Sequence, residues 1–131
     1  MPLKELFDEG LYVASRLMEA NNRHDALTVL QLLAENEAFG DVRMMACINC
    51  ALVSGYLGNV DDALAWYDRA IAIEAAHATR FSARRKAGYF AELGRNDESL
   101  ALYMELLSGP LPPEEAEQIR AAIDALDGPA A

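Results

Sequence analysis

Apolar side chains recur at intervals of three and four residues along most of the chain, which is the period of a helix packed on one face. No segment alternates apolar and polar residues, with β-branched enrichment, over the length of a strand. The pattern therefore predicts an all-α protein with seven helices, at about 3–20, 23–36, 42–57, 60–75, 80–93, 96–108 and 113–126.

Turn and capping residues agree with these helix ends. Gly58 and Gly94 fit the left-handed position that follows a helix, where glycine has no steric penalty. Pro113 suits the first turn of the last helix, where a backbone N–H has no partner in any case. The expected N-caps, whose side chains accept hydrogen bonds from a first turn, are Asn22, Asp41 and Asn59.

A repeat runs through the first 113 residues. Three times, a small residue is followed twelve positions later by a second small residue that opens another helix: Ala14 with Ala26, Ala51 with Ala63, and Ala87 with Ser99. From Ala14 to Ala51 is 37 residues and from Ala51 to Ala87 is 36. Paired small side chains allow the two antiparallel helices of a hairpin to approach closely, so we expect three equivalent helical hairpins.

This spacing resembles the tetratricopeptide repeat (TPR) family, whose period is about 34 residues. The likeness covers about residues 3–111, in repeats at about 7–40, 44–77 and 80–113. It implies three TPR-like hairpins stacked as a short right-handed solenoid, in one domain over residues 1–131. The chain departs from the family at its tryptophan position, which holds Gly10, Cys47 and Ala83. A run of helical hairpins unrelated to the family is the alternative, with nearly the same architecture.

The last helix, 113–126, has no partner helix of its own. It places Ile119, Ala122, Ile123 and Leu126 on one face, with charged residues opposite. We expect it to cap the open end of the stack, as terminal repeats do. A short disordered tail is expected at 127–131.

Composition narrows the classes of partner. The 131 residues carry 21 acidic and 11 basic side chains, and the formal net charge of −10 opposes binding to nucleic acid. No stretch is long and apolar enough for a membrane span, and the first residues lack the pattern of a signal peptide. The expectation is a cytoplasmic protein that binds neither nucleic acid nor membrane.

The sequence contains few residues arranged as a catalytic or metal-binding site would require. Cys47 and Cys50 lie inside a predicted helix, whereas a redox pair needs its first thiolate at a helix N-terminus. We expect packed core thiols. His24 and His77 have no Ser, Cys or carboxylate neighbour at a suggestive spacing, so we expect no catalytic residue, metal site or cofactor, and no enzyme.

The family resemblance implies that the first helix of each hairpin lines a concave groove. The side chains expected to form this partner-binding groove are Leu11, Met18, Met45, Ile48, Asn49, Leu52, Tyr56, Phe81, Arg84 and Arg85. A mostly apolar floor suits an amphipathic helix or an extended peptide. Four of the eleven basic residues fall within residues 80–86, and arginine pairs bidentately with carboxylates, so acidic residues are expected in the partner segment.

TPR modules that hold the tails of heat-shock chaperones use two lysines, two asparagines and one arginine. Only Asn49 and Arg85 match that clamp here, because Leu11, Ser15 and Phe81 occupy its other positions. The missing lysines argue against this ligand.

The sequence thus predicts a protein–protein interaction module, a scaffold or co-chaperone, that binds a partner segment in its groove. In size, acidity, repeat number and final helix the chain also resembles the small acidic TPR chaperones of bacterial type III secretion. Such a chaperone would shield an apolar segment of an export substrate. A third reading is a homodimer formed through the same groove.

Overall fold

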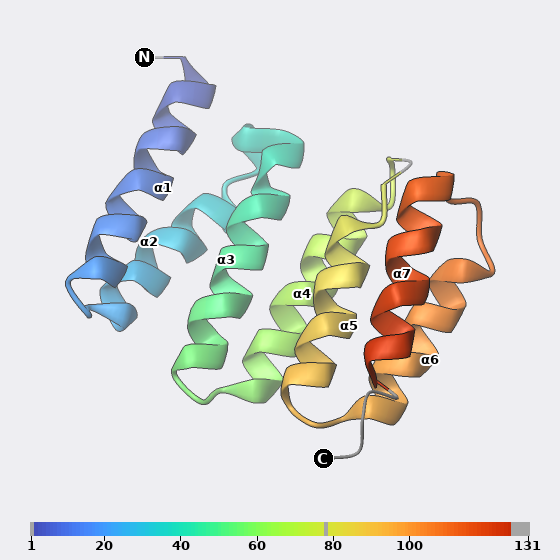
Figure 1. The fold of residues 1–131 in the computed structure, drawn as a ribbon. Helices are drawn as coiled ribbons and strands as arrows, with labels where there is room; N and C mark the ends of the chain where they lie inside the picture. Colours follow the sequence, from blue (N-terminus) through green and yellow to red (C-terminus); the bar gives the residue numbers. More distant parts are fainter. Residues whose placement is uncertain (1, 78, 127–131) are drawn as a thin grey trace. The chain divides into compact units, whose positions relative to one another are not determined.

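A computed structural model describes residues 2–77 and 79–126, and this part of the chain contains helices and no strands. The α-helices are α1 (Leu3–Glu19), α2 (Arg23–Glu35), α3 (Arg43–Tyr56), α4 (Val60–Glu74), α5 (Phe81–Glu92), α6 (Asn96–Leu107) and α7 (Pro113–Leu126), with a 3-10 helix η1 (Glu37–Val42) between α2 and α3 (Figure 1). Each of the seven predicted helices is present, and both of its ends agree within one residue. The all-α prediction is therefore confirmed for the described residues.

The chain forms two compact units, Met1–His77 and Ala78–Ala131. The first contains α1 to α4 and η1, and the second contains α5 to α7. The boundary falls between the second and third predicted repeats, so each repeat lies within one unit. The single stack of three repeats stays a prediction, and the expected disordered tail at 127–131 lies outside the described residues.

In the first unit, each helix packs against the next one along the chain: α1 on α2, α2 on α3 and α3 on α4 (Figure 1). Both members of each predicted small-residue pair in this unit are buried, as a close helix crossing requires: Ala14 and Ala26, and Ala51 and Ala63. Gly10 serves the same purpose, because a Cβ there would come within 2.8 Å of both methyl carbons of Leu33. Small side chains therefore set the closeness of the hairpins.

α3 is the most enclosed helix of this unit. Because it packs on both α2 and α4, the side chains on most of its circumference are buried: Ala46, Cys47, Ile48, Cys50, Ala51, Val53 and Ser54. From α4, Trp66 and Tyr67 complete the core. The helical spacing in the sequence indicates one buried face, whereas two neighbouring helices cover α3.

The segment between α2 and α3, for which the sequence predicts no helix, is itself ordered. It forms η1, in which the Phe39 ring contacts the Phe7 ring edge-on at 5.2 Å between centroids. Asp41 lies within η1, so the prediction that it caps α3 is wrong, and Val42 holds that position. The Asp41 carboxylate instead lies 2.8 Å from Nε2 of His77, which ties the end of this unit to η1.

The other predicted helix ends are confirmed. Asn22 and Asn59 occupy the N-cap positions of α2 and α4, but neither side chain accepts a hydrogen bond from a backbone N–H of the first turn, so the expected capping bonds are not formed. The Asn22 amide instead donates to the carboxylate of Asp25 at 2.8 Å. Gly58 and Gly94 adopt the left-handed conformation, with φ of 82° and 76°. Asn21 takes the equivalent position after α1, with φ of 59°, a conformation that asparagine tolerates better than most residues.

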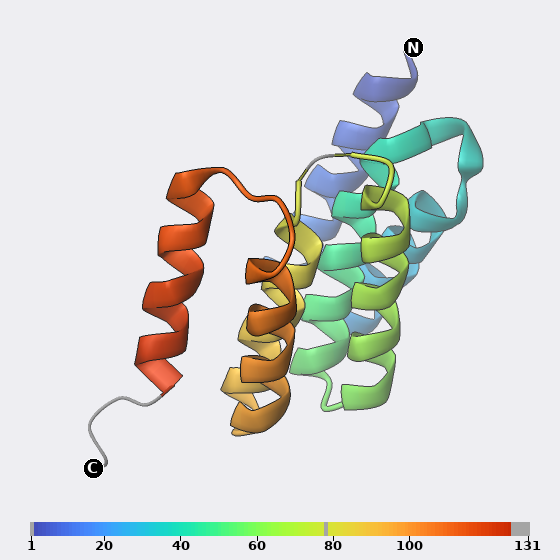
Figure 2. The same cartoon turned by 90° about the vertical axis from the view of Figure 1, so that its right-hand side faces the viewer.

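In the second unit, α5 and α6 form the third hairpin and α7 packs on α6 (Figure 2). The third small pair is confirmed here, and it carries a hydrogen bond: Ser99 Oγ donates to the backbone carbonyl of Ala87 at 2.7 Å. Ile119 of α7 is buried, as its expected packing face requires.

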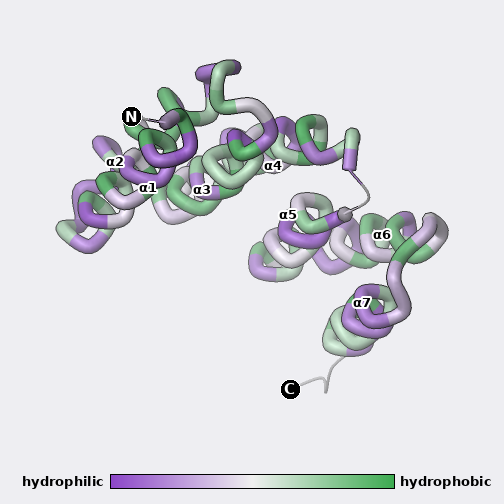
Figure 3. The backbone as a smooth tube through the Cα atoms, turned by 90° about the horizontal axis from the view of Figure 1, so that it is seen from above, coloured by the Kyte–Doolittle hydropathy of each residue, from purple (hydrophilic) through white to green (hydrophobic). Residues whose placement is uncertain are grey.

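Hydrophobic and hydrophilic segments alternate along the helices, as expected for elements that each bury one face (Figure 3). Within residues 2–77 and 79–126, no helix is both long and apolar enough to cross a membrane.

Candidate functional site

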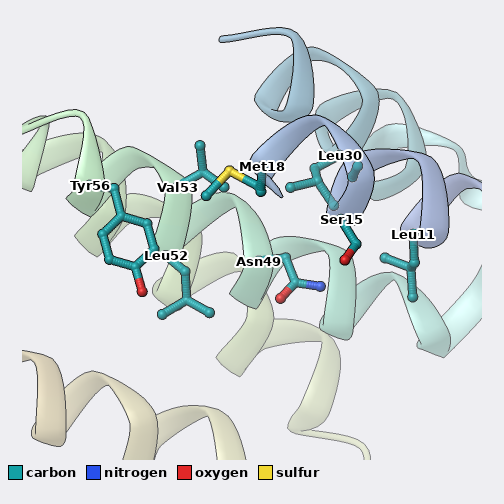
Figure 4. A pocket seen from close by; sticks show the side chains of 9 residues that line it. Leu11, Ser15, Met18, Leu30, Asn49, Leu52, Val53 and Tyr56 are labelled. Carbon is teal, nitrogen blue, oxygen red and sulfur yellow. The ribbon is translucent and has the colours of Figure 1, made fainter. Parts of the chain in front are cut away.

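A pocket in the first unit opens between α1, α2 and α3 (Figure 4). Its volume is about 310 Å³. The residues that line this pocket, called here the apolar pocket, are Leu11, Ala14, Ser15, Met18, Leu30, Asn49, Leu52, Val53 and Tyr56.

The apolar pocket has a buried floor and a more exposed wall. Ala14, Leu30 and Val53 are almost fully buried and form its floor. Leu11, Met18, Asn49 and Leu52 are half-buried, and Ser15 is exposed. An apolar side chain that entered this space would exchange water for contacts on several sides, which is the main source of binding free energy at such sites.

Two polar side chains, Ser15 and Asn49, face this mostly apolar space from α1 and α3 (Figure 4). In the part of the chain that the structure describes, neither side chain forms a hydrogen bond. An asparagine amide offers both donors and acceptors, so it can pair with the peptide group of a bound segment.

Tyr56 forms the rim at the C-terminal end of α3, with 61% of its surface exposed. The guanidinium of Arg23 lies 5.5 Å from the centre of its ring and donates to its backbone carbonyl at 3.4 Å. The Arg23 contact restricts the tyrosine ring and places a positive charge beside it. An exposed aromatic side chain held in this way is a typical anchor for a protein partner.

A second pocket lies within the second unit. Its volume is about 390 Å³, and α5, α6 and α7 contribute its lining: Phe81, Arg84, Arg85, Tyr103, Gln118, Ile119 and Ala122. We call it the basic pocket. Burial raises the pKa of the Tyr103 hydroxyl, although Arg84 acts in the opposite direction, so this group stays protonated at neutral pH.

The two arginines of the basic pocket are not equivalent. Arg84 donates to Oε1 of Gln118 at 2.8 Å and lies 3.6 Å from a carboxylate oxygen of Glu115. It therefore holds α7 through both Gln118 and Glu115. Arg85 is exposed, with its guanidinium 6.0 Å from the centre of the Phe81 ring. Arg85 is the arginine that is placed to meet a partner carboxylate.

The structure divides the predicted groove residues between the two units. Leu11, Met18, Asn49, Leu52 and Tyr56 meet in the apolar pocket, and Phe81, Arg84 and Arg85 meet in the basic pocket.

Two predicted groove residues line neither of these pockets. Ile48 is only 2% exposed, because the enclosed position of α3 buries it, so its assignment to the groove surface is wrong. Met45 is partly exposed one turn before Asn49 but does not line the apolar pocket.

The sequence pattern did not reveal the floor residues Leu30 and Val53 or the contact of Arg23 with Tyr56. Arg23 and Tyr56 are 33 residues apart, and no local pattern links them.

The cysteines are confirmed as core residues. Cys47 and Cys50 are free thiols and are fully buried. Burial raises the pKa of both thiols, and for Cys50 the neighbouring Cys47 adds to the effect. A thiol that stays protonated is a poor nucleophile and a poor metal ligand. Among the described residues, no group of three His, Cys, Asp or Glu side chains could hold a metal ion.

No family model matches the sequence, and no curated protein matches it significantly. The resemblance to the TPR family thus stays a prediction that rests on the repeat spacing and on the small-residue pairs.

Proposed function

We propose that the protein is a cytoplasmic, TPR-type interaction module that holds a peptide or amphipathic helix of a partner protein, as a scaffold or co-chaperone. The apolar pocket of the first unit carries this proposal. It joins a buried apolar floor to an exposed aromatic rim, and this combination is typical of the central anchor sites of protein interfaces.

The size of the apolar pocket favours side chains over a free small molecule. Its volume of about 310 Å³ is at the lower limit for drug-sized ligands, which take roughly 300–1,000 Å³. That space accommodates one or two large apolar side chains. A helix or an extended segment would insert these side chains and set its backbone near Asn49.

The basic pocket supplies the second part of the proposal. Arg85 beside Phe81 offers a fork of N–H donors for a carboxylate, together with an apolar surface. An acidic residue next to an apolar side chain in the partner would suit the basic pocket by itself. The arginine would act mainly on the rate of association, since long-range attraction steers the encounter of charged partners.

The test begins with affinity purification of the tagged protein from its native cells and identification of the captured protein. Binding of that partner is then measured for Tyr56→Ala and for Tyr12→Ala. The two tyrosines are 61% and 63% exposed, but Tyr12 does not line the apolar pocket. We expect Tyr56→Ala to weaken binding by about 2 kcal/mol, mainly through faster dissociation, and Tyr12→Ala to bind normally.

Charge reversal tests the basic pocket separately. Arg85→Glu should slow association and reduce its dependence on salt, whereas Arg120→Glu, an exposed site on α7 outside the basic pocket, should not. Normal binding by folded Tyr56→Ala and Arg85→Glu variants would contradict the proposal, and would move the binding surface elsewhere.

A further inference from the structure

α1 carries a second apolar face in addition to the one it buries. Leu3, Leu6, Gly10, Val13 and Leu17 follow one another at intervals of three, four, three and four residues. This is the spacing of a coiled-coil seam. Leu6 and Val13 remain 46% and 44% exposed, and Leu17 is half-buried. The seam of α1 therefore lacks part of its packing within the chain.

This seam is distinct from the apolar pocket. With 3.6 residues per turn, the pocket residues Leu11, Ser15 and Met18 point roughly 125° away from it around the helix. A molecule bound to the seam would leave the apolar pocket open.

α2 continues the apolar surface beside the seam. Leu33 of α2 covers Gly10, which places the two helices in close contact at the middle of the seam. On the side of α2 away from Ala34, which is buried, Val29 is half-buried and Leu32 is 68% exposed. The α1–α2 hairpin thus leaves apolar side chains exposed or half-buried on both of its helices, called here the outer face: Leu6, Val13, Leu17, Val29 and Leu32.

The charges beside the seam indicate what covers it. Glu9 and Arg16 are seven residues apart, so they occupy the same column of α1, on the side of the seam away from α2. Among the residues that the structure describes, Arg16 has an ion pair only with Glu19 of its own helix, at 3.4 Å, and both side chains are about two-thirds exposed. The column is therefore acidic toward the N-terminus and basic toward the C-terminus.

When a second copy runs antiparallel, the acidic end of this column on one copy lies beside the basic end of the same column on the other. A two-fold axis across the seam would pair Leu6 of one copy with Leu17 of the other, and place Val13 over Leu33, which covers Gly10. The same register brings each Glu9 near Arg16 of the other copy. In a parallel pair, this column would face the column of Phe7 and Ala14, which is buried within the chain and carries no charge.

We propose that two copies of this chain associate through the outer face, with α1 antiparallel to α1 and α2 antiparallel to α2. The two hairpins would form a four-helix bundle and bury both outer faces. This interface differs from the groove-mediated dimer considered from the sequence, and it does not depend on the proposed function of the pockets.

The experiment measures the mass of the purified protein alone by sedimentation equilibrium, up to about 100 μM. We expect twice the chain mass of 14.3 kDa. Glu9→Arg and Arg16→Glu should each weaken the dimer by about tenfold, because each places like charges together at two symmetric positions. The double variant Glu9→Arg/Arg16→Glu should restore the dimer, since it exchanges the two charges.

Apolar and pocket variants complete the test. Val13→Glu should give a monomer with unchanged helical circular dichroism, and Tyr56→Ala should remain dimeric. If Val13→Glu unfolds the protein, the exposed charge variants Glu9→Arg and Arg16→Glu still test whether the outer face forms the dimer. A monomeric wild-type protein, or a double variant as weak as the single ones, would overturn the proposal. Loss of the dimer in Tyr56→Ala alone would place the interface at the apolar pocket instead.

Discussion

Side-chain size at the helix crossings controls how closely each hairpin packs. In the first two hairpins both members of the small pair are alanine, whereas the third pairs Ala87 with Ser99. The hydroxyl of Ser99 is buried there, and its hydrogen bond to the carbonyl of Ala87 offsets the cost of removing it from water. A residue of this size is required at the crossing, but the hydroxyl itself is not.

Substitution of Ser99 should separate these two effects. Ser99→Ala should reduce the free energy of unfolding by about 1 kcal/mol or less. It removes one hydrogen bond but keeps a side chain of the same size as the alanines at this position in the first two hairpins. Ser99→Leu should cost about 3 kcal/mol, because it forces the helices apart. Urea unfolding measures both, and equal losses would show that size is not the deciding property.

The buried cysteines should make stability depend on alkaline pH. Burial raises both thiol pKa values above the ordinary value of 9.0, so above pH 9 the unfolded chain ionises while the folded chain does not. The stabilising contribution is complete below pH 9 and is lost as the pH rises. Between pH 8 and pH 10, the wild type should lose about 1 kcal/mol or more of stability relative to Cys47→Ala/Cys50→Ala. Parallel losses in the two proteins would contradict the assignment of core thiols.

At the scale of elements, periodicity and local residues were sufficient to predict the seven helices. Gly58, Gly94 and Pro113 act within one or two residues of themselves, so the sequence reveals them directly. Asp41 was misassigned because its partner, His77, is 36 residues away. Ile48 was misplaced because a helical wheel shows one buried face, whereas α3 is covered by two neighbouring helices.

Of the seven helices, α7 is the one whose side-chain contacts were least predictable from the sequence. Glu114 and Glu115 both lie in its first turn, but only Glu115 is half-buried, with Arg84 3.6 Å away. Adjacent acidic residues give no sequence signal that distinguishes the buried one. Five residues of the apolar pocket, Leu11, Met18, Asn49, Leu52 and Tyr56, were among those expected in the groove, because the family resemblance selects the first helix of each hairpin and helical spacing selects its face.

A matched pair of substitutions should isolate this contact. Glu115→Lys brings a lysine beside the guanidinium of Arg84, whereas Glu114→Lys changes the same helix end without a nearby arginine in the described contacts. We expect Glu115→Lys to lower the free energy of unfolding by about 1 kcal/mol more, with faster hydrogen exchange in α7. Similar exchange in the two variants would show that the pair does not hold α7.

At the scale of the molecule, the two proposals have a joint consequence. A dimer formed through the outer face would carry two apolar pockets, so it could hold two copies of a partner at once. On a surface densely coated with the captured partner, the wild type should dissociate more slowly than Glu9→Arg. With the partner free in solution, calorimetry should give the same affinity per site for both proteins. A persistent difference in solution would mean that Glu9 itself contacts the partner.

The order of packing in each unit also bears on how the chain reaches its fold. The most extensive contacts join helices that are consecutive in the chain, and three residues suffice to connect α1 to α2, α3 to α4 and α5 to α6. Such contacts close short loops, so little chain entropy is lost before they form, and proteins of this kind fold in microseconds to milliseconds. During synthesis, each hairpin can form as soon as its second helix leaves the ribosome, before the next hairpin has been made.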